Sequence, residues 1–106
     1  MDDIKVADQN FEEEVLNSKN PVLVDFWGSW CIPSQMMMPI LDRLNKEIGM
    51  TVKIRKLNVD QNPKIRERFN IMGCPTFILF KNGKEVERRV GAQSDMMLKE
   101  MINSSM

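Results

Sequence analysis

The run Val-Leu-Val-Asp-Phe-Trp at residues 22–27 is the feature that most constrains how this chain can fold. Five of its six side chains are apolar, so a strand formed here needs cover on both of its faces. A strand of this kind lies in the middle of a sheet, with helices packed on both sides. We therefore predict an α/β protein in which residues 22–27 form a central strand.

Four further segments have the pattern of strands. An alternating run predicts a strand at 51–59, and a weaker signal indicates one at 4–6. Residues 76–80 and 86–90 flank the pair Asn82-Gly83, which is a strong signal for a tight hairpin. We therefore expect the last two strands to be antiparallel.

Helical patterns lie between these strands. Asp8 is placed to cap a first helix, and Ser94 to cap a final one. Asn62, followed by a proline, predicts the start of a short helix. Another helix begins near Ser34 and contains Pro39, which predicts a kink. The resulting order predicts a mixed sheet with helices on both faces, and we interpret residues 1–106 as a single domain.

The balance of charge disfavours several functions. Fifteen basic and fifteen acidic side chains cancel, so no global field would hold the chain on nucleic acid or on an anionic membrane. The apolar stretches fall far short of the roughly 20 residues that cross a bilayer, and the acidic, polar start is not that of a signal peptide. We expect a cytoplasmic monomer that binds neither nucleic acid nor membranes.

The sequence has no histidine and only two cysteines. Ser-His and Cys-His nucleophile pairs and the usual zinc sites all need imidazole, so these sites are excluded and no metal is expected. Two cysteines are also too few for the disulfide framework of a small secreted scaffold. The role of each cysteine must therefore be inferred from the residues around it.

Cys31 lies where the central strand ends and a helix is expected to begin, within Trp-Gly-Ser-Trp-Cys-Ile-Pro-Ser at residues 27–34. Ligand sites of open α/β sheets lie outside the carboxyl ends of the strands. The start of a helix also favours the thiolate over the thiol, and the thiolate is the nucleophile. We predict that Cys31 is reactive; the alternative is an inert, buried cysteine.

Several motifs, in this order, give the chain a resemblance to the thioredoxin family over nearly its whole length. They are residues 22–27, 30–34, 56–63, 73–77, 80–83 and 90–92. The resemblance implies the thioredoxin fold, a mixed five-stranded sheet flanked by four helices. It also implies thiol-disulfide exchange with disulfide-containing protein substrates, without a cofactor.

The chain departs from the family at Ser34, which stands where the family has its second cysteine. In the two-cysteine mechanism the second thiol resolves the mixed disulfide that the first one forms. Serine cannot take that step, so mixed disulfides would form through Cys31 but resolve poorly. Ser34 is compatible with an engineered trap and with a natural Cys-x-x-Ser protein. A thioredoxin reductase is implied for a two-cysteine form only.

Asp25 is the one charged residue of the central strand. Loss of water around a buried carboxyl penalises its charged form, so its pKa should be raised. The resemblance implies that Asp25 handles the proton of the second cysteine and that Lys56 approaches it. The alternatives are a structurally tolerated acid and a plain surface lysine.

The resemblance further implies that Pro75 has a cis peptide bond and lies beside Cys31, within an apolar rim that binds substrate. That rim would comprise Trp30, Ile32, Pro33, Gly73, Cys74, Pro75, Val90, Gly91 and Ala92. Cys74 could then act as a resolving thiol, bridge to Cys31 or be a bystander.

Two other functions remain open from the sequence. The same rim could hold partners without any redox step, as a binding module. Alternatively, Cys31 and Cys74 of two chains could supply four thiolates to an iron–sulfur cluster.

Overall fold

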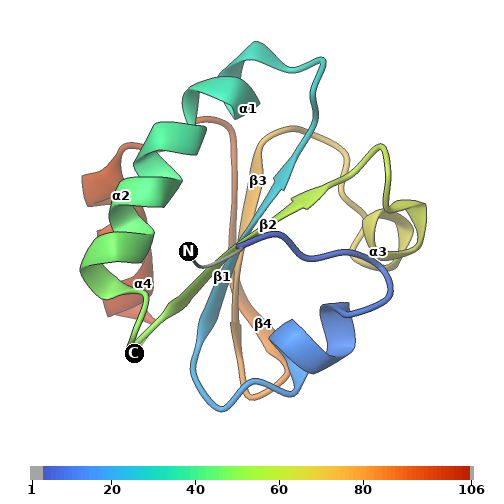
Figure 1. Cartoon of the computed structure of the whole chain (residues 1–106). Helices are drawn as coiled ribbons and strands as arrows, with labels where there is room; N and C mark the ends of the chain where they lie inside the picture. The colour runs from blue at the N-terminus through green and yellow to red at the C-terminus, as the bar shows by residue number, and fades with distance from the viewer. Residues whose placement is uncertain (1–3, 106) are drawn as a thin grey trace.

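The structure, a computed structural model, describes residues 4–105 and contains a mixed sheet with helices on both faces (Figure 1). Its strands are β1 (Val22–Trp27), β2 (Lys53–Asn58), β3 (Thr76–Lys81) and β4 (Lys84–Val90), in the spatial order β2-β1-β3-β4. β1 is parallel to β2 and antiparallel to β3, and β3 is antiparallel to β4. The predicted central strand is thus confirmed, because β1 has a neighbour on each side.

The expected fifth strand, at residues 4–6, is wrong: within residues 4–105 the sheet has four strands. At its edge Lys5 forms only an isolated parallel bridge with Lys56 of β2. The amide of Lys56 donates to the carbonyl of Ile4 at 2.8 Å, and the amide of Val6 donates to the carbonyl of Lys56 at 2.9 Å. The chain then leaves the sheet in a turn at residues 8–10, so the pairing ends before a strand can form.

The predicted hairpin is present between β3 and β4. Asn82 and Gly83 have φ angles of 53° and 79°. Positive φ at both central residues is the backbone conformation of a type I′ turn, whose twist matches that of the two strands it joins. This turn brings β4 back alongside β3 in the antiparallel direction.

The helical segments are a π-helical turn, η1 (Glu12–Leu16), and the helices α1 (Ile32–Met36), α2 (Met38–Ile48), α3 (Pro63–Arg68) and α4 (Asp95–Ser104). The interruption between α1 and α2 falls at Met37 and confirms the predicted kink. Pro39 lies in the first turn of α2, where its missing N–H leaves no hydrogen bond of that helix unmade. Ser94 caps α4 as predicted, accepting a bond from the amide of Met97 at 3.1 Å.

Two other caps differ from expectation. Asp8 does not cap η1; its carboxylate accepts hydrogen bonds from the amides of Lys64 and Ile65, at 3.2 and 3.0 Å, at the start of α3. Asn62 therefore does not cap α3 with its own side chain. It instead donates to the carbonyl of Asn58 at 2.9 Å and accepts from the amide of Asp8 at 2.9 Å. Tertiary contact, rather than local sequence, supplies the cap of α3.

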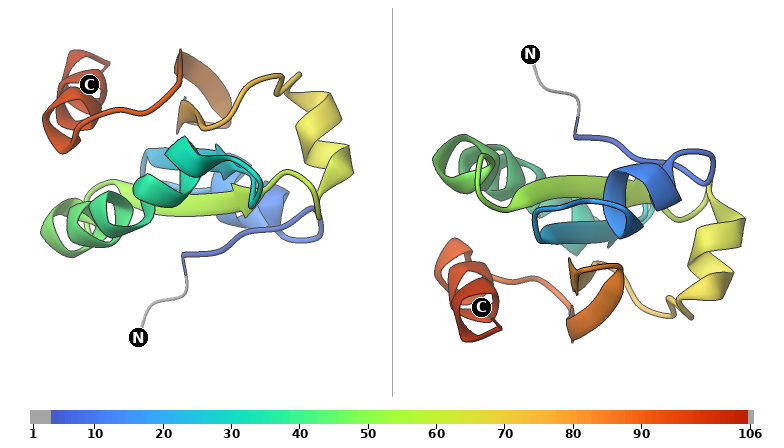
Figure 2. Two further views of the ribbon diagram at one scale, coloured as in Figure 1. Left: turned by 90° about the horizontal axis from the view of Figure 1, so that it is seen from above. Right: turned by 90° about the horizontal axis from the view of Figure 1, so that it is seen from below.

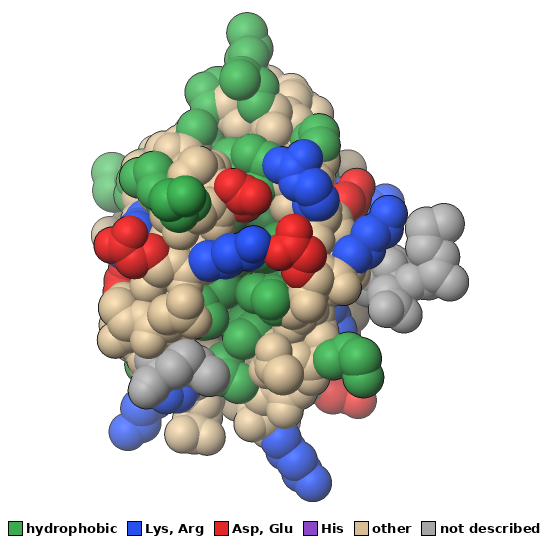
Figure 3. Space-filling view, turned by 90° about the vertical axis from the view of Figure 1, so that its left-hand side faces the viewer, with side chains coloured by type: hydrophobic (Ala, Val, Ile, Leu, Met, Phe, Trp, Pro, Cys, Tyr) green, Lys and Arg blue, Asp and Glu red, His purple; other side chains and the backbone are tan. Residues whose placement is uncertain are grey.

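The sheet separates two apolar clusters, which accounts for the continuous apolar character of β1. Leu23 faces α2 and α4, whereas its neighbours Val22 and Val24 face η1 and α3. Figure 2 shows the helices on the two sides of the sheet, and Figure 3 shows the side of the molecule that carries α2 and α4, where a row of acidic and basic side chains crosses an apolar strip. On that face Lys99 and Glu47 form an ion pair of 2.6 Å between the two helices. None of the helices in residues 4–105 is long and apolar enough to cross a membrane.

Candidate active site

Cys31 lies at the amino-terminal cap position of α1, after the end of β1. Its backbone is extended, with φ −106° and ψ 109°. Its amide donates to the carbonyl of Gly28 at 3.1 Å, and its carbonyl accepts from the amide of Gln35 at 3.2 Å. The tight turn from strand to helix thus fixes the backbone of Cys31. Cys31 is 8% exposed.

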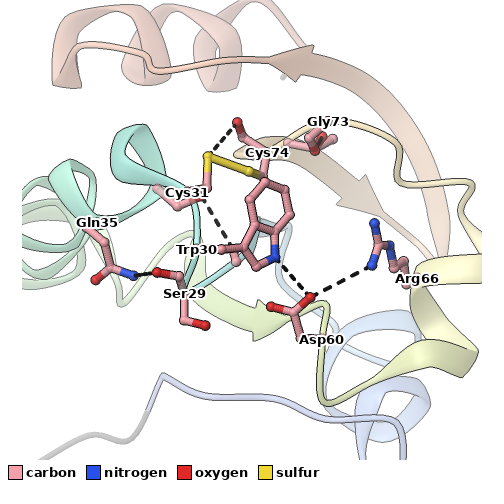
Figure 4. Close-up of a disulfide and its surroundings, with 11 residues drawn as sticks. Ser29, Trp30, Cys31, Gln35, Asp60, Arg66, Gly73 and Cys74 are labelled. Atoms are coloured by element: carbon pink, nitrogen blue, oxygen red, sulfur yellow. Dashed lines mark hydrogen bonds and ion pairs between the residues drawn. A yellow bond between two sulfur atoms is a disulfide. The ribbon is translucent and has the colours of Figure 1, made fainter.

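Cys31 and Cys74 form a disulfide across the site, as Figure 4 shows. Their Cα atoms are 6.6 Å apart, within the range that disulfides span without movement of the backbone. Sγ of Cys31 also lies 3.2 Å from the carbonyl oxygen of Cys74. Of the three possibilities left open for Cys74, the structure contains the bridge.

The segment that carries Cys74 is held from several sides. The peptide bond between Cys74 and Pro75 is cis, as the resemblance implied. The hydroxyl of Thr76 donates to the carbonyl of Gly73 at 2.6 Å, and the amide of Gly91 donates to the carbonyl of Pro75 at 2.8 Å. These contacts fix the position of the Cys74 backbone relative to β3 and β4.

Ser34 is fully buried on α1. Its Oγ accepts a hydrogen bond from the amide of Gly28 at 3.4 Å. The hydroxyl therefore lies under the same turn that presents Cys31, on the inner side of the helix.

Asp25 is completely buried on β1, and neither of its carboxylate oxygens has a hydrogen-bond partner within the described residues. Burial raises the pKa of this carboxyl to about 8, while the positive charge of Lys56 acts in the opposite direction. Asp25 and Lys56 are register partners of β1 and β2, but no ion pair joins them. The Nζ of Lys56 instead lies 3.7 Å from Sδ of Met38. The predicted rise in the pKa of Asp25 agrees with its burial.

The residues predicted to form the rim come from three segments: the turn before α1 and the start of α1, the loop before β3, and the end of β4 with the residues after it. Three large apolar side chains are strongly exposed: Trp30 is 61% exposed, Ile32 75% and Val90 61%. Pro33 and Ala92 are also exposed, Gly73, Cys74 and Gly91 are partly buried, and Pro75 is buried. A Cβ on Gly73 would lie 2.9 Å from Cγ1 of Val90, so a larger residue here would require the exposed side chain of Val90 to shift.

One polar contact of the site was missed by sequence reasoning. Nε1 of Trp30 donates to Oδ1 of Asp60 at 3.0 Å, and Asp60 lies 3.9 Å from Nη1 of Arg66 (Figure 4). The indole lies over Gly28, where a Cβ would approach Nε1 to 2.8 Å. A signal for Asp60 did exist: it follows β2 as Cys31 follows β1, and parallel strands end at the same edge of a sheet.

The structure offers no support for the iron–sulfur alternative. That alternative draws two thiolates from each of two chains; within residues 4–105 of one chain, no group of three or more His, Cys, Asp or Glu side chains could hold a metal ion. The disulfide also uses both sulfur atoms that each chain would contribute to a shared cluster.

Comparison with known proteins agrees with the fold. The sequence profile of the family described as Thioredoxin matches residues 2–104. A thioredoxin from Rickettsia bellii (strain RML369-C) is 45% identical over 100 residues, which cover 94% of this chain and 95% of the relative. A thioredoxin from Buchnera aphidicola subsp. Acyrthosiphon pisum (strain APS) is 43% identical over 102 residues, covering 96% of this chain and 94% of the relative.

Proposed function

Because this chain belongs to the thioredoxin family, we propose that it is a thiol-disulfide oxidoreductase that attacks protein disulfides through the thiolate of Cys31. The observation that carries this proposal is the position of Cys31. Cys31 follows the end of the central strand and lies beside the cis peptide bond of Pro75. Its sulfur is bonded to that of a second cysteine, Cys74. We also propose that residues 1–106 act as a single domain. The cytoplasmic location of the protein stays a prediction.

The attack needs only the reduced form of Cys31. Its thiolate displaces one sulfur of the target disulfide, which leaves as a thiolate, and the other sulfur becomes bonded to Sγ of Cys31. The exposed side chains of Trp30, Ile32 and Val90 offer apolar contact to an extended target beside this sulfur. In this role they bind substrate, together with the small residues Gly73, Gly91 and Ala92.

Ser34 takes no part in resolving the mixed disulfide. Its hydroxyl is buried and bonded to the amide of Gly28, and an alcohol is far less acidic than a thiol, so it supplies no nucleophile at neutral pH. Any route through position 34 is therefore closed. The expectation that mixed disulfides on Cys31 resolve poorly rests on the loss of this route and stays a prediction.

The proposal is tested by reduction of insulin with dithiothreitol as the electron donor. The chain should raise the rate above that of dithiothreitol alone, and Cys31→Ser should return it to that background. Ser29→Ala, which changes an exposed hydroxyl two residues away, serves as the matched control and should keep the activity. Equal, background rates for the chain and for Cys31→Ser would instead favour the binding module without redox activity.

A further inference from the structure

The oxidised form of this protein joins two cysteines that are 43 positions apart in the sequence, on opposite sides of the site (Figure 4). The chain contains no other cysteine. The disulfide therefore accounts for every thiol that could serve in exchange, and position 34 supplies none of them.

We propose that Cys74 is the resolving thiol of this protein, so that its redox couple is Cys31 and Cys74. This inference rests on the proposed function, because it needs Cys31 to form a mixed disulfide first. Cys74, in the loop before β3, then performs the resolving step that a cysteine at position 34 of α1 performs in the two-cysteine mechanism.

The reaction balances without any further reactant. In the first step the thiolate of Cys31 bonds to one sulfur of the target and releases the other as a thiolate. In the second step the thiolate of Cys74 attacks Sγ of Cys31, and the bond between Cys31 and the target breaks. The target leaves as a second thiolate, so one target disulfide is reduced and the two thiols of the chain are oxidised to one disulfide.

The fold places Cys74 where this second step needs it. The separation of 6.6 Å between the two Cα atoms is compatible with the bond that the step forms. The hydrogen bonds from Thr76 to Gly73 and from Gly91 to Pro75 hold the backbone on both sides of Cys74. A thiol held this close has a high effective concentration, so its attack is favoured over that of any thiol free in solution.

Cys74 also differs from Ser34 in its surroundings. Cys74 is partly exposed, whereas Ser34 is 0% exposed beneath the turn at Gly28. Position 74 is therefore more accessible to solvent than position 34.

The test uses the reduced chain, freed of reductant, and one equivalent of dithiobis(nitrobenzoate), whose thiolate product is coloured. We expect release of both thiolates from each reagent molecule and no lasting adduct. The second release should have a rate independent of protein concentration, because it is intramolecular. Peptide mapping of the product should find Cys31 linked to Cys74.

The decisive comparison is with Cys74→Ser, and with Cys74→Ala as a second variant. Each should release one thiolate and keep the other on Cys31 for a time about a hundredfold longer or more. Adducts of equal lifetime with and without Cys74 would overturn the inference and leave the proposed function intact. If neither form of the chain released any thiolate, both proposals would be wrong. The map of the unaltered chain decides the matter even if a variant fails to fold.

Discussion

Asp25 and Lys56 are register partners on parallel strands, yet they form no ion pair: Nζ of Lys56 lies 3.7 Å from Sδ of Met38. Asp25 is consequently a buried carboxyl without a hydrogen-bond partner in the described residues. Burial raises its pKa to about 8, so at neutral pH the folded protein holds it mainly in the protonated form. This arrangement makes the stability of the fold depend on pH.

Asp25→Asn should stabilise the protein at alkaline pH and much less at acid pH. In the unfolded chain this carboxyl ionises near its usual pKa of 3.8, and in the folded chain near 8. Between these values only the folded state holds the proton, so the stability contributed by Asp25 is complete below about pH 4 and is lost as pH rises toward 8. The free energy of unfolding of the parent should fall relative to Asp25→Asn by roughly 1 kcal/mol per pH unit in that range.

Urea unfolding of both proteins from pH 4 to 9, with the disulfide intact in each, measures this difference. Asp42→Asn removes an exposed carboxyl on α2 and serves as the control, for which we expect no comparable trend. A constant difference between Asp25→Asn and the parent across the whole range would contradict the raised pKa.

Lys56→Met should raise the pKa of Asp25 further, above about 8, because it removes the positive charge that lowers this pKa. Methionine keeps the length and the apolar character of the side chain beside Met38. The titration of the Asp25 carboxyl carbon, followed by NMR, measures the change. An unchanged or lower pKa would mean that Lys56 has no electrostatic effect on Asp25.

Asp8→Ala should destabilise the fold by about 1–2 kcal/mol, because the amides of Lys64 and Ile65 at the start of α3 lose their acceptor. The melting temperature should fall by about 5 °C or more. Asp42→Ala, which removes an exposed carboxyl without a part in a cap, should leave it nearly unchanged. Equal melting temperatures for the two variants would show that Asp8 does not stabilise α3.

The outcome for Asp8 illustrates which parts of the fold can be predicted from the sequence. The strand at residues 22–27, the hairpin at Asn82-Gly83 and the cap at Ser94 all follow from signals within a few residues. Asp8, by contrast, caps a helix more than fifty positions away in the chain, and a local cap signal does not contain its partner. The same reason explains why a strand is expected at residues 4–6 but only an isolated bridge forms at Lys5. Whether an edge segment forms a strand depends on how many residues run alongside β2, and the local sequence does not determine that number.

The same distinction holds for the site. The position of Cys31 follows from the pattern of strand, turn and helix, and the high pKa of Asp25 follows from the apolar run around it. The bond between Cys31 and Cys74, and the contact of Trp30 with Asp60, join segments that only the folded sheet brings together. Sequence reasoning left the role of Cys74 open because a bridge depends on a distance between two loops.

Ser34→Cys should restore resolution to a chain that lacks Cys74. In the double variant Ser34→Cys/Cys74→Ser, the introduced thiol lies on α1, whose amino-terminal cap position is Cys31, and takes the position of the family's second cysteine. The second thiolate of dithiobis(nitrobenzoate), retained by Cys74→Ser alone, should be released again. A lasting adduct in the double variant would mean that a thiol at position 34 cannot reach Cys31 in this fold.

The roles of Cys31 and Cys74 are tested most directly by a single turnover of the unaltered, reduced chain with insulin, stopped with acid and analysed by mass spectrometry. We predict insulin that has one disulfide reduced and is heavier by two hydrogens, and a protein lighter by two hydrogens whose peptides containing Cys31 and Cys74 are joined by a disulfide. A lasting covalent adduct between Cys31 and an insulin chain, with the thiol of Cys74 still free, would contradict it.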